Sequence, residues 1–208
     1  MTSMSIAIID YGHGNLDSIA RAVQECGGKP IVTSSASDIE TATHIVLPGV
    51  GAFASGMGSI KKMGLDVVLT NQAINNGIPF LGICLGMQLL AKRGYEGGEC
   101  LGLGWINGEV KRLEPEKPST RIPHVGWNEV HYAQNSPLFI GIPDGKDFYF
   151  THSYHMLCND QREVLAVTPY CCGFASVVGQ RNIWGVQFHP EKSQKYGFQL
   201  LRNFVALH

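Results

Sequence analysis

The chain has 208 residues, of which 44% are hydrophobic and 16% are charged. This length and this balance are typical of one globular domain, and they exclude a disordered or low-complexity chain. The chain has 16 Lys and Arg residues and 17 Asp and Glu residues, which give a net charge of −1. This charge provides no broad electrostatic basis for binding nucleic acid or an anionic membrane, so any partner must be recognised locally.

The first half of the chain alternates short apolar runs with helical periodicity. We expect strands at 6–9, 30–33, 44–47 and 80–83. Between the first two strands we expect a helix with Asn15 as N-cap and apolar residues at 16, 19, 20 and 23. A short helical turn capped by Ser37 or Asp38 should follow the second strand, and a helix over 65–74 should precede the fourth. Strands that alternate with helices favour a mostly parallel central sheet with helices on both faces.

The second half of the chain predicts more strands than helices. We expect strands at 105–113, 148–154, 164–167 and 175–178, a hairpin connection at 179–182 into a strand at 183–188, and a final helix that begins at Ser193 and buries Leu200, Leu201, Phe204 and Leu207. These strands are expected to extend the sheet in antiparallel fashion. Because no linker or repeat interrupts the chain, residues 1–208 are predicted to form a single α/β domain.

The first ten residues contain no basic segment, and their apolar run ends at Asp10, too early for a signal peptide or a membrane span. We therefore expect a cytoplasmic protein in which the six cysteines are reduced. No CxxC pair indicates zinc, and His152 and His155, three apart on a predicted strand, would point to opposite faces. The sequence predicts neither a metal nor a cofactor.

The segment 80–90, FLGICLGMQLL, predicts a sharp turn between a strand and a helix over 85–92, with Cys84 at the crest. Gly82 and Gly86 flank the cysteine, and such a turn needs small neighbours because side chains there would collide with the folded backbone. A helix N-terminus also favours the thiolate. From this segment alone, an exposed nucleophile and a buried core residue are equally good interpretations of Cys84.

A second segment favours the nucleophile. GVQFHPEKS (185–193) ends a predicted strand in His189, and Glu191 lies two residues further on. In an extended backbone, both side chains leave the same face, so His189 could face the thiol while Glu191 orients the imidazole ring. An activated cysteine requires such a base and such an orienting acid, and the alternative is an ordinary surface pair after a strand.

Together these segments resemble the triad-type glutamine amidotransferases over essentially the whole chain. The resemblance rests on five blocks in addition to the elbow, namely DYGHGN (10–15), LPGVGAF (47–53), PHVGWN (123–128), FTHSY (150–154) and GVQFHPEKS (185–193). Within that family the blocks are most similar to those of glutaminase subunits that serve imidazole glycerol phosphate synthases. The resemblance implies a class I amidotransferase fold and a glutaminase with a Cys84, His189 and Glu191 triad.

The resemblance also implies roles for residues around the triad. The backbone amide of Leu85 and an amide of the Val50-Gly51 loop would stabilise the oxyanion, and the glycines beside Val50 raise the hypothesis that this loop flips when a partner binds. Gln88, Tyr149, Ser153 and Tyr154 would surround the bound glutamine. Metals and cofactors play no part in this scheme.

The resemblance further implies a heterodimer partner, a (β/α)₈-barrel cyclase that receives the ammonia and makes imidazole glycerol phosphate and AICAR for histidine biosynthesis. Asn15, Trp127 and Lys192 would face this partner. Three alternatives stay open: a paralogous glutaminase that supplies a related barrel for surface-sugar amination, a stand-alone cysteine hydrolase, and a binding subunit without activity, which the intact triad disfavours.

Overall fold

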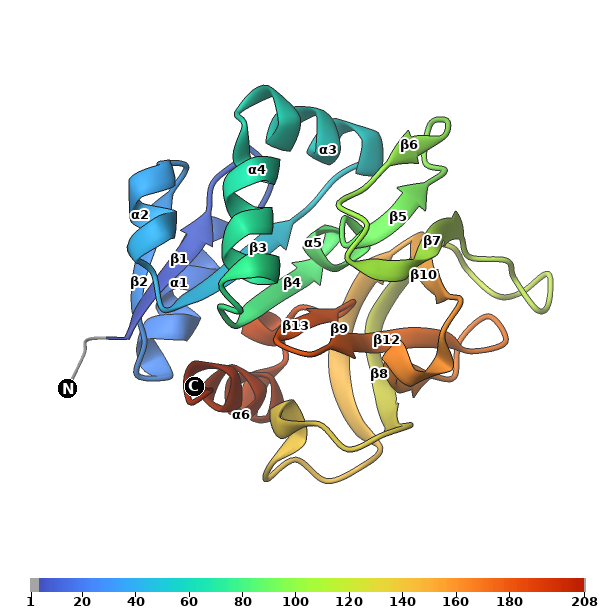
Figure 1. The fold of residues 1–208 in the computed structure, drawn as a ribbon. Coiled ribbons are helices and arrows are strands. Elements are labelled where there is room, and N and C mark those ends of the chain that lie inside the picture. The colour runs from blue at the N-terminus through green and yellow to red at the C-terminus, as the bar shows by residue number, and fades with distance from the viewer. Residues whose placement is uncertain (1–3, 208) are drawn as a thin grey trace.

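A nine-stranded mixed sheet runs through the computed structural model, which describes residues 4–207 (Figure 1). The strand order is β2-β1-β3-β4-β13-β12-β11-β8-β9. The parallel strands are β1 (Ser5–Ile9), β2 (Lys29–Thr33), β3 (His44–Gly49), β4 (Phe80–Cys84) and β13 (Ile183–Val186). The strands added in antiparallel fashion are β12 (Phe174–Gln180), β11 (Val164–Thr168), β8 (His124–Tyr132) and β9 (Lys146–His152). The expected α/β fold with antiparallel additions from the second half is therefore confirmed, with one correction: the strand expected at 183–188, β13, is parallel to β4 and not antiparallel to it.

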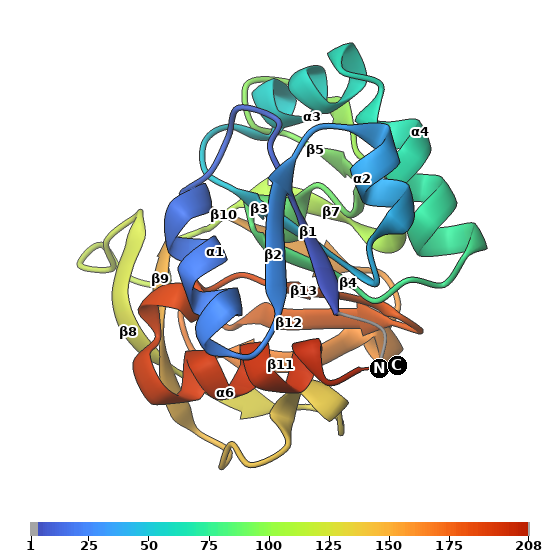
Figure 2. The same ribbon diagram turned by 90° about the vertical axis from the view of Figure 1, so that its left-hand side faces the viewer.

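Helices cover both faces of the parallel strands, as Figure 2 shows. One face carries α1 (Leu16–Glu25) and α6 (Gln194–Val205), and the other carries α2 (Ala36–Thr41), α3 (Phe53–Lys62) and α4 (Leu65–Thr70), which continues into a π-helical turn (Asn71–Asn75). Strand alternation separates the two cores: Ile6 and Ile8 lie in the core beneath α1 and α6, whereas Ala7 and Ile9 lie in the core beneath the other helices. Burial on both faces explains the continuous apolar runs of these strands.

A second, four-stranded sheet was not predicted, and it corrects one expected helix. It has the order β10-β7-β5-β6, with bounds Tyr154–Cys158, Ile106–Arg112, Ala91–Gly94 and Cys100–Leu101. The helix expected over 85–92 is a single turn, α5 (Leu85–Gln88), because Ala91 and the residues after it enter β5. The carbonyl of Leu90 accepts hydrogen bonds from the backbone of Trp105 and Ile106. An apolar run alone does not distinguish a buried helix from a buried strand.

Several smaller expectations are corrected as well. The turn α2 begins after Ser35 rather than at Ser37 or Asp38, and α3 and β8 were not predicted. The strand expected over 148–154 is broken at Ser153, so that its two parts belong to different sheets. Short 3-10 turns lie at Pro137–Phe139, Gln161–Glu163 and Pro190–Lys192. In the described part of the chain, no helix combines the length and the apolar character needed to cross a membrane.

Candidate active site

Cys84 ends β4 at the carboxyl edge of the parallel strands, between β3 and β13. Its backbone has a φ of 55° and a ψ of −110°, a conformation that is strained for a residue with a side chain and that marks a sharp turn into α5. A Cβ at Gly82 would lie 2.6 Å from the carbonyl oxygen of Gly86, and one at Gly86 would overlap the carbonyl of Leu47. The predicted elbow is present, and Cys84 at its crest is buried, with 7% of its surface exposed, whereas the elbow by itself suggested an exposed side chain.

His189 and Glu191 form a buried pair beside the elbow, with Nδ1 2.9 Å from the Glu191 Oε1 atom. The strand expected to place them ends at Val186, and the pair instead spans the start of the 3-10 turn Pro190–Lys192. Its geometry therefore comes from a turn and not from strand alternation. The amide of His189 is also held by the carbonyl of Tyr149, 2.9 Å away, which fixes the backbone of the turn.

The surroundings of His189 favour its charged form. Burial by itself would lower the pKa, but the neighbouring Cys84 and Glu191 outweigh burial and raise the pKa of His189 to about 9. Its Nε2 atom is buried and has no hydrogen-bond partner among residues 4–207. The ring thus has one nitrogen fixed by an acid and the other available for a reacting group, as a base next to a nucleophile requires.

Two weak contacts hold the Cys84 sulfur. The side-chain amide of Gln187 donates to Sγ over 3.7 Å, and the carbonyl oxygen of Thr151 lies 3.9 Å from Sγ. Gln187 is fully buried and lies on the segment between β13 and His189. Sequence reasoning assigned it no role, although it stands in the same GVQFHPEKS block.

A cavity of about 310 Å³ opens over the sulfur and has the size of a small-ligand site. Its lining residues come from both halves of the chain: Val50, Gly51, Cys84, Leu85, Gln88, Glu96, Thr151, His152, Ser153 and Tyr154. Of the predicted site residues, the structure thus brings together the nucleophile, both oxyanion segments and three of the four substrate residues. Glu96 was missed because β5, the strand that precedes it, was not predicted: the first two residues of β5 were assigned to a helix over 85–92, and the rest were assigned to no element.

The fourth predicted substrate residue, Tyr149, does not line this cavity. Its ring lies 6.0 Å from that of Trp127 in an edge-on arrangement, and the Lys192 ammonium lies 5.8 Å from the Tyr149 ring centre. Asn15 and Lys192 line a second, narrow pocket together with His189 and Glu191. The three predicted interface residues therefore lie near the site, and Trp127 is 47% exposed.

The loop at Val50 and Gly51 is held by a side chain that the sequence did not single out. The Nδ1 atom of His13 lies 3.3 Å from the carbonyl oxygen of Val50, and its Nε2 atom lies 3.1 Å from the hydroxyl of Ser59. Gly51 has a φ of 112°, a conformation that favours glycine. The backbone of this loop thus depends on one histidine and one glycine.

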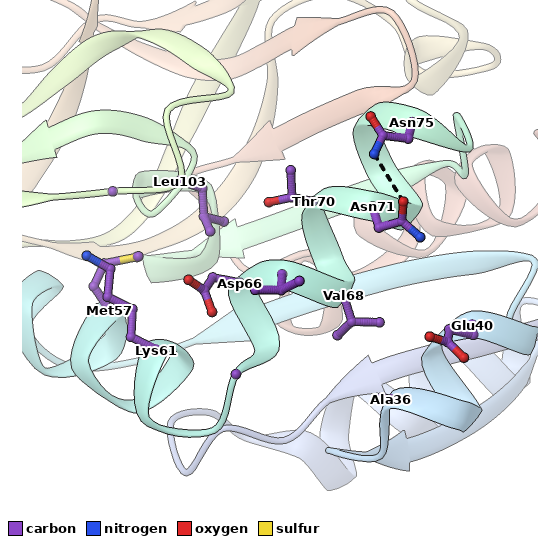
Figure 3. Close-up of a pocket in the computed structure, with 13 residues that line it drawn as sticks. Ala36, Glu40, Met57, Lys61, Asp66, Val68, Thr70, Asn71, Asn75 and Leu103 are labelled. Atoms are coloured by element: carbon purple, nitrogen blue, oxygen red, sulfur yellow. Dashed lines mark hydrogen bonds between the residues drawn. The ribbon is translucent and has the colours of Figure 1, made fainter.

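A larger surface pocket of about 780 Å³ lies elsewhere, between α2, α3, α4 and residues 102–103 (Figure 3). Its polar lining includes Glu40, Lys61 and Asp66, and the described residues around it include neither cysteine nor histidine. Size alone therefore does not identify the reactive site. Within residues 4–207 no three His, Cys, Asp or Glu side chains gather as a metal site, and His152 and His155 lie on separate strands, β9 and β10, rather than on one.

Comparisons with known proteins agree with this geometry. The family model described as glutamine amidotransferase class-I matches residues 7–207. The chain is 44% identical to "Imidazole glycerol phosphate synthase subunit HisH 1" of Campylobacter jejuni, covering 97% of this chain and 100% of the relative. It is 45% identical to "Imidazole glycerol phosphate synthase subunit HisH" of Moorella thermoacetica, covering 97% and 94%.

Solved structures show the same fold at lower sequence identity. The structure of PurLQS from Thermotoga maritima matches with a TM-score of 0.73 and 16% identity, covering 98% of each chain. A crystal structure of a glutamine amidotransferase matches with a TM-score of 0.71 and 17% identity, covering 95% of this chain and 96% of that one. At these identities the structural likeness establishes the fold, and function must be argued from the site.

Proposed function

The chain belongs to the class I glutamine amidotransferases, and from this premise we propose that it is the glutaminase subunit of an imidazole glycerol phosphate synthase. It hydrolyses glutamine to glutamate and ammonia and passes the ammonia to a second subunit. The observation that carries the proposal is the strained, buried Cys84 beside a His189 whose other ring nitrogen is fixed by Glu191. Full-length similarity to named synthase subunits supports the choice of pathway.

The chemistry follows from the charges of the triad. The Cys84 sulfur attacks the side-chain amide carbon of glutamine, and His189, charged after taking the thiol proton, protonates the leaving nitrogen as the C–N bond breaks. Ammonia leaves, and a glutamyl thioester remains on Cys84. Water, deprotonated by His189, then adds to the thioester carbon, and the C–S bond breaks to release glutamate. Glu191 holds the imidazole tautomer and stabilises its positive charge in both steps.

Each step passes through a tetrahedral oxyanion that needs preorganised donors. The amide of Leu85 follows the nucleophile directly and is one candidate donor. The second comes from the Val50-Gly51 loop, which lines the same cavity. His13 holds the carbonyl of Val50 in the present orientation of this loop. We propose that a bound partner changes this orientation.

The remaining cavity residues provide groups that complement glutamine. Gln88 and the backbone of Ser153 and Tyr154 would bind the amide and the α-carboxylate of the substrate. We add Glu96 to this set, because it lines the same cavity, its charge complements the α-ammonium of glutamine, and one of its carboxylate oxygens is fixed by the backbone N–H of Phe53. Tyr149, which lies outside the cavity, is proposed instead as part of the face that includes Trp127 and Lys192.

The released ammonia needs protection from water, since in bulk solution at neutral pH it becomes ammonium, which is not a nucleophile. We propose that a (β/α)₈-barrel cyclase docks over Asn15, Trp127 and Lys192, receives the ammonia, and makes imidazole glycerol phosphate and AICAR. A half-exposed tryptophan whose ring contacts Tyr149, with the Lys192 ammonium over that same tyrosine, is typical of an interface anchor. Cytoplasmic location is part of the same proposal, because six free thiols suit a reducing compartment.

One experiment tests the proposal and separates it from its alternatives. Glutamine hydrolysis is measured for the chain alone, with a purified cyclase barrel, and with the barrel and its ribonucleotide ligand. We expect strong acceleration only when the barrel is present. Acceleration by a sugar-aminating barrel and not by the cyclase would indicate the paralogous pathway, whereas full activity of the isolated chain would indicate a stand-alone hydrolase.

A further inference from the structure

Two buried histidines connect the cavity wall to a strand that the mechanism does not use. His124 on β8 and His152 on β9 are register partners in the sheet, and the Nδ1 atom of His124 lies 3.0 Å from the Nε2 atom of His152. Both side chains are buried, with 4% and 6% of their surfaces exposed. His152 lines the cavity, whereas His124 does not. Neither residue belongs to the triad, so their contact requires its own explanation.

The hydrogen bonds around this pair have one consistent direction. His152 Nδ1 donates to the carbonyl oxygen of Tyr154 over 2.9 Å, since a carbonyl can only accept. A neutral His152 therefore accepts at Nε2, so His124 must donate from Nδ1 and accept at Nε2. The donor to that Nε2 is the side-chain amide of Asn128, 3.2 Å away. The amide is oriented by its own oxygen, which accepts from the backbone N–H of Glu129 over 2.9 Å.

The chain of bonds ends at an atom that organises the other wall of the site. The Tyr154 carbonyl oxygen also accepts a hydrogen bond from Gln88 Nε2, 2.9 Å away, which donates in addition to the Oε1 atom of Gln187 over 3.1 Å. Gln187 in turn donates to the Cys84 sulfur. Both lone pairs of the Tyr154 carbonyl are thereby used. The backbone after Ser153 is thus fixed from two directions, by the histidines and by Gln88.

These hydrogen-bond directions require that both imidazole rings are neutral, and burial favours the neutral form. Burial lowers the pKa of His124 to about 4 and the pKa of His152 to about 3. His124 is also stacked between aromatic rings, with its centre 4.0 Å from that of Tyr170 and 4.9 Å from that of Phe150. Burial therefore favours the neutral form of both histidines, to which the hydrogen-bond directions above apply.

We propose that His124 and Asn128 are positioning residues for glutamine binding, acting through His152 on the Tyr154 carbonyl. This inference rests on the proposed function, because it assumes that the 153–154 segment holds the substrate. A segment that is already held in place loses no conformational entropy when its amide groups bind the substrate. Loss of the hydrogen bonds that hold it therefore weakens glutamine binding more than it slows the chemical step. The strand that carries this support also carries the exposed Trp127.

The sharpest test is Asn128→Asp, which keeps the shape of the side chain and its bond to Glu129 but replaces the donor to His124 with an acceptor. At pH 8 the neutral His124 must then donate from Nε2, so that its Nδ1 and the Nε2 of His152 both present lone pairs to each other. We expect KM for glutamine to rise about tenfold, with kcat changed less than about threefold. Asn128→Ala should raise KM only about threefold, because water can reach this half-buried position.

Two further variants separate positioning from general packing. His124→Phe keeps the stacked ring but removes both hydrogen bonds, and it should raise KM about as much as Asn128→Asp. Val130→Ala removes buried apolar surface from the same strand without touching the hydrogen bonds, and it should leave KM unchanged. Glutamine affinity is also measured by calorimetry in a Cys84→Ala background, which gives a dissociation constant without turnover.

The outcomes distinguish this inference from the proposed function. If the unsubstituted protein hydrolyses or binds glutamine and Asn128→Asp has the same KM and dissociation constant, the positioning role is wrong and the proposed function stands. If the unsubstituted protein does neither, the proposed function is wrong and the inference with it. Nitrogen NMR of the imidazoles provides a direct readout: both rings should carry their proton on Nδ1, and Asn128→Asp should move the proton of His124 to Nε2.

Discussion

The two walls of the cavity are made rigid in different ways. The wall with Cys84, the proposed nucleophile, relies on backbone strain and on Gly82 and Gly86, where any side chain would overlap a neighbouring carbonyl. The opposite wall, from Thr151 to Tyr154, relies on hydrogen bonds that reach outward through buried histidines. Tight packing of the backbone fixes the position of the Cys84 sulfur, whereas hydrogen bonds fix the position of residues 151–154 on the opposite wall. Substitutions in the two walls should therefore have different effects on activity.

The largest effect is expected at the nucleophile. Cys84→Ala should reduce glutamine-dependent synthesis by about 10⁶-fold, because the other triad members act only through the sulfur. Synthesis from added ammonium salt by the complex with the barrel should survive, since it bypasses the cavity. Cys172→Ser, at an exposed thiol, is the control and should leave both activities intact. Loss of both activities in Cys84→Ala would mean that this residue supports the fold or the interface instead.

A smaller loss is expected at the acid. Glu191→Gln should reduce kcat by about 10⁴-fold, roughly 10²-fold less than loss of the nucleophile, because the imidazole keeps a polar partner but loses the charge that stabilises it. The pH–rate profile measures a second consequence: without the carboxylate the pKa of His189 falls, and the alkaline limit of activity moves to lower pH. An unchanged alkaline limit would argue against the ion pair.

The same raised pKa has a consequence for stability. His189 has its pKa raised from 6.5 to about 9 in the folded protein, so its contribution to the free energy of unfolding is fully present below pH 6.5 and is lost as the pH rises through 9. Chemical unfolding measured from pH 6 to pH 10 should show this decline in the unsubstituted protein. The decline should be smaller in Glu191→Gln, where the folded-state pKa lies nearer to the unfolded value.

Near the hydrogen-bonded wall, Trp127→Ala should weaken the barrel complex by about tenfold or more, as is typical of an aromatic side chain that becomes buried when a partner binds. The dissociation constant is measured by calorimetry or fluorescence titration. Ile140→Ala, which removes an exposed apolar side chain elsewhere, is the matched control. Equal affinity in both variants would remove Trp127 from the interface.

The smallest effect is expected at the loop of the strained wall. Gly51→Ala places a side chain at a φ of 112°, so the loop must leave its present conformation. We expect the ratio of barrel-stimulated to basal glutaminase activity to change by about fivefold, because the proposed oxyanion donor and the His13 contact share this loop. A ratio equal to that of the unsubstituted protein would argue that the loop does not respond to the partner.

The sequence predicted the elements that follow from local patterns. Apolar runs predicted the parallel strands, and the paired glycines at 82 and 86 predicted the elbow, because these signals depend on residues that are close in the chain. Local patterns could not distinguish helix from strand where every residue is buried. The apolar run Leu89 to Ala91 fits either element, and only hydrogen bonds to residues distant in the chain determine that β5 forms there. Glu96 was missed for that reason.

What the sequence alone determined is the set of groups available for chemistry: a cysteine at a turn, a histidine with an acid two residues later, and the motifs of a glutamine amidotransferase. What only the tertiary structure decided is which groups meet. It excluded Tyr149 from the lining of the cavity, included Glu96 in that lining, and joined His124 to Tyr154 through His152. The physical reason is that hydrogen-bond direction and burial depend on neighbours distant in the chain, which no local pattern contains.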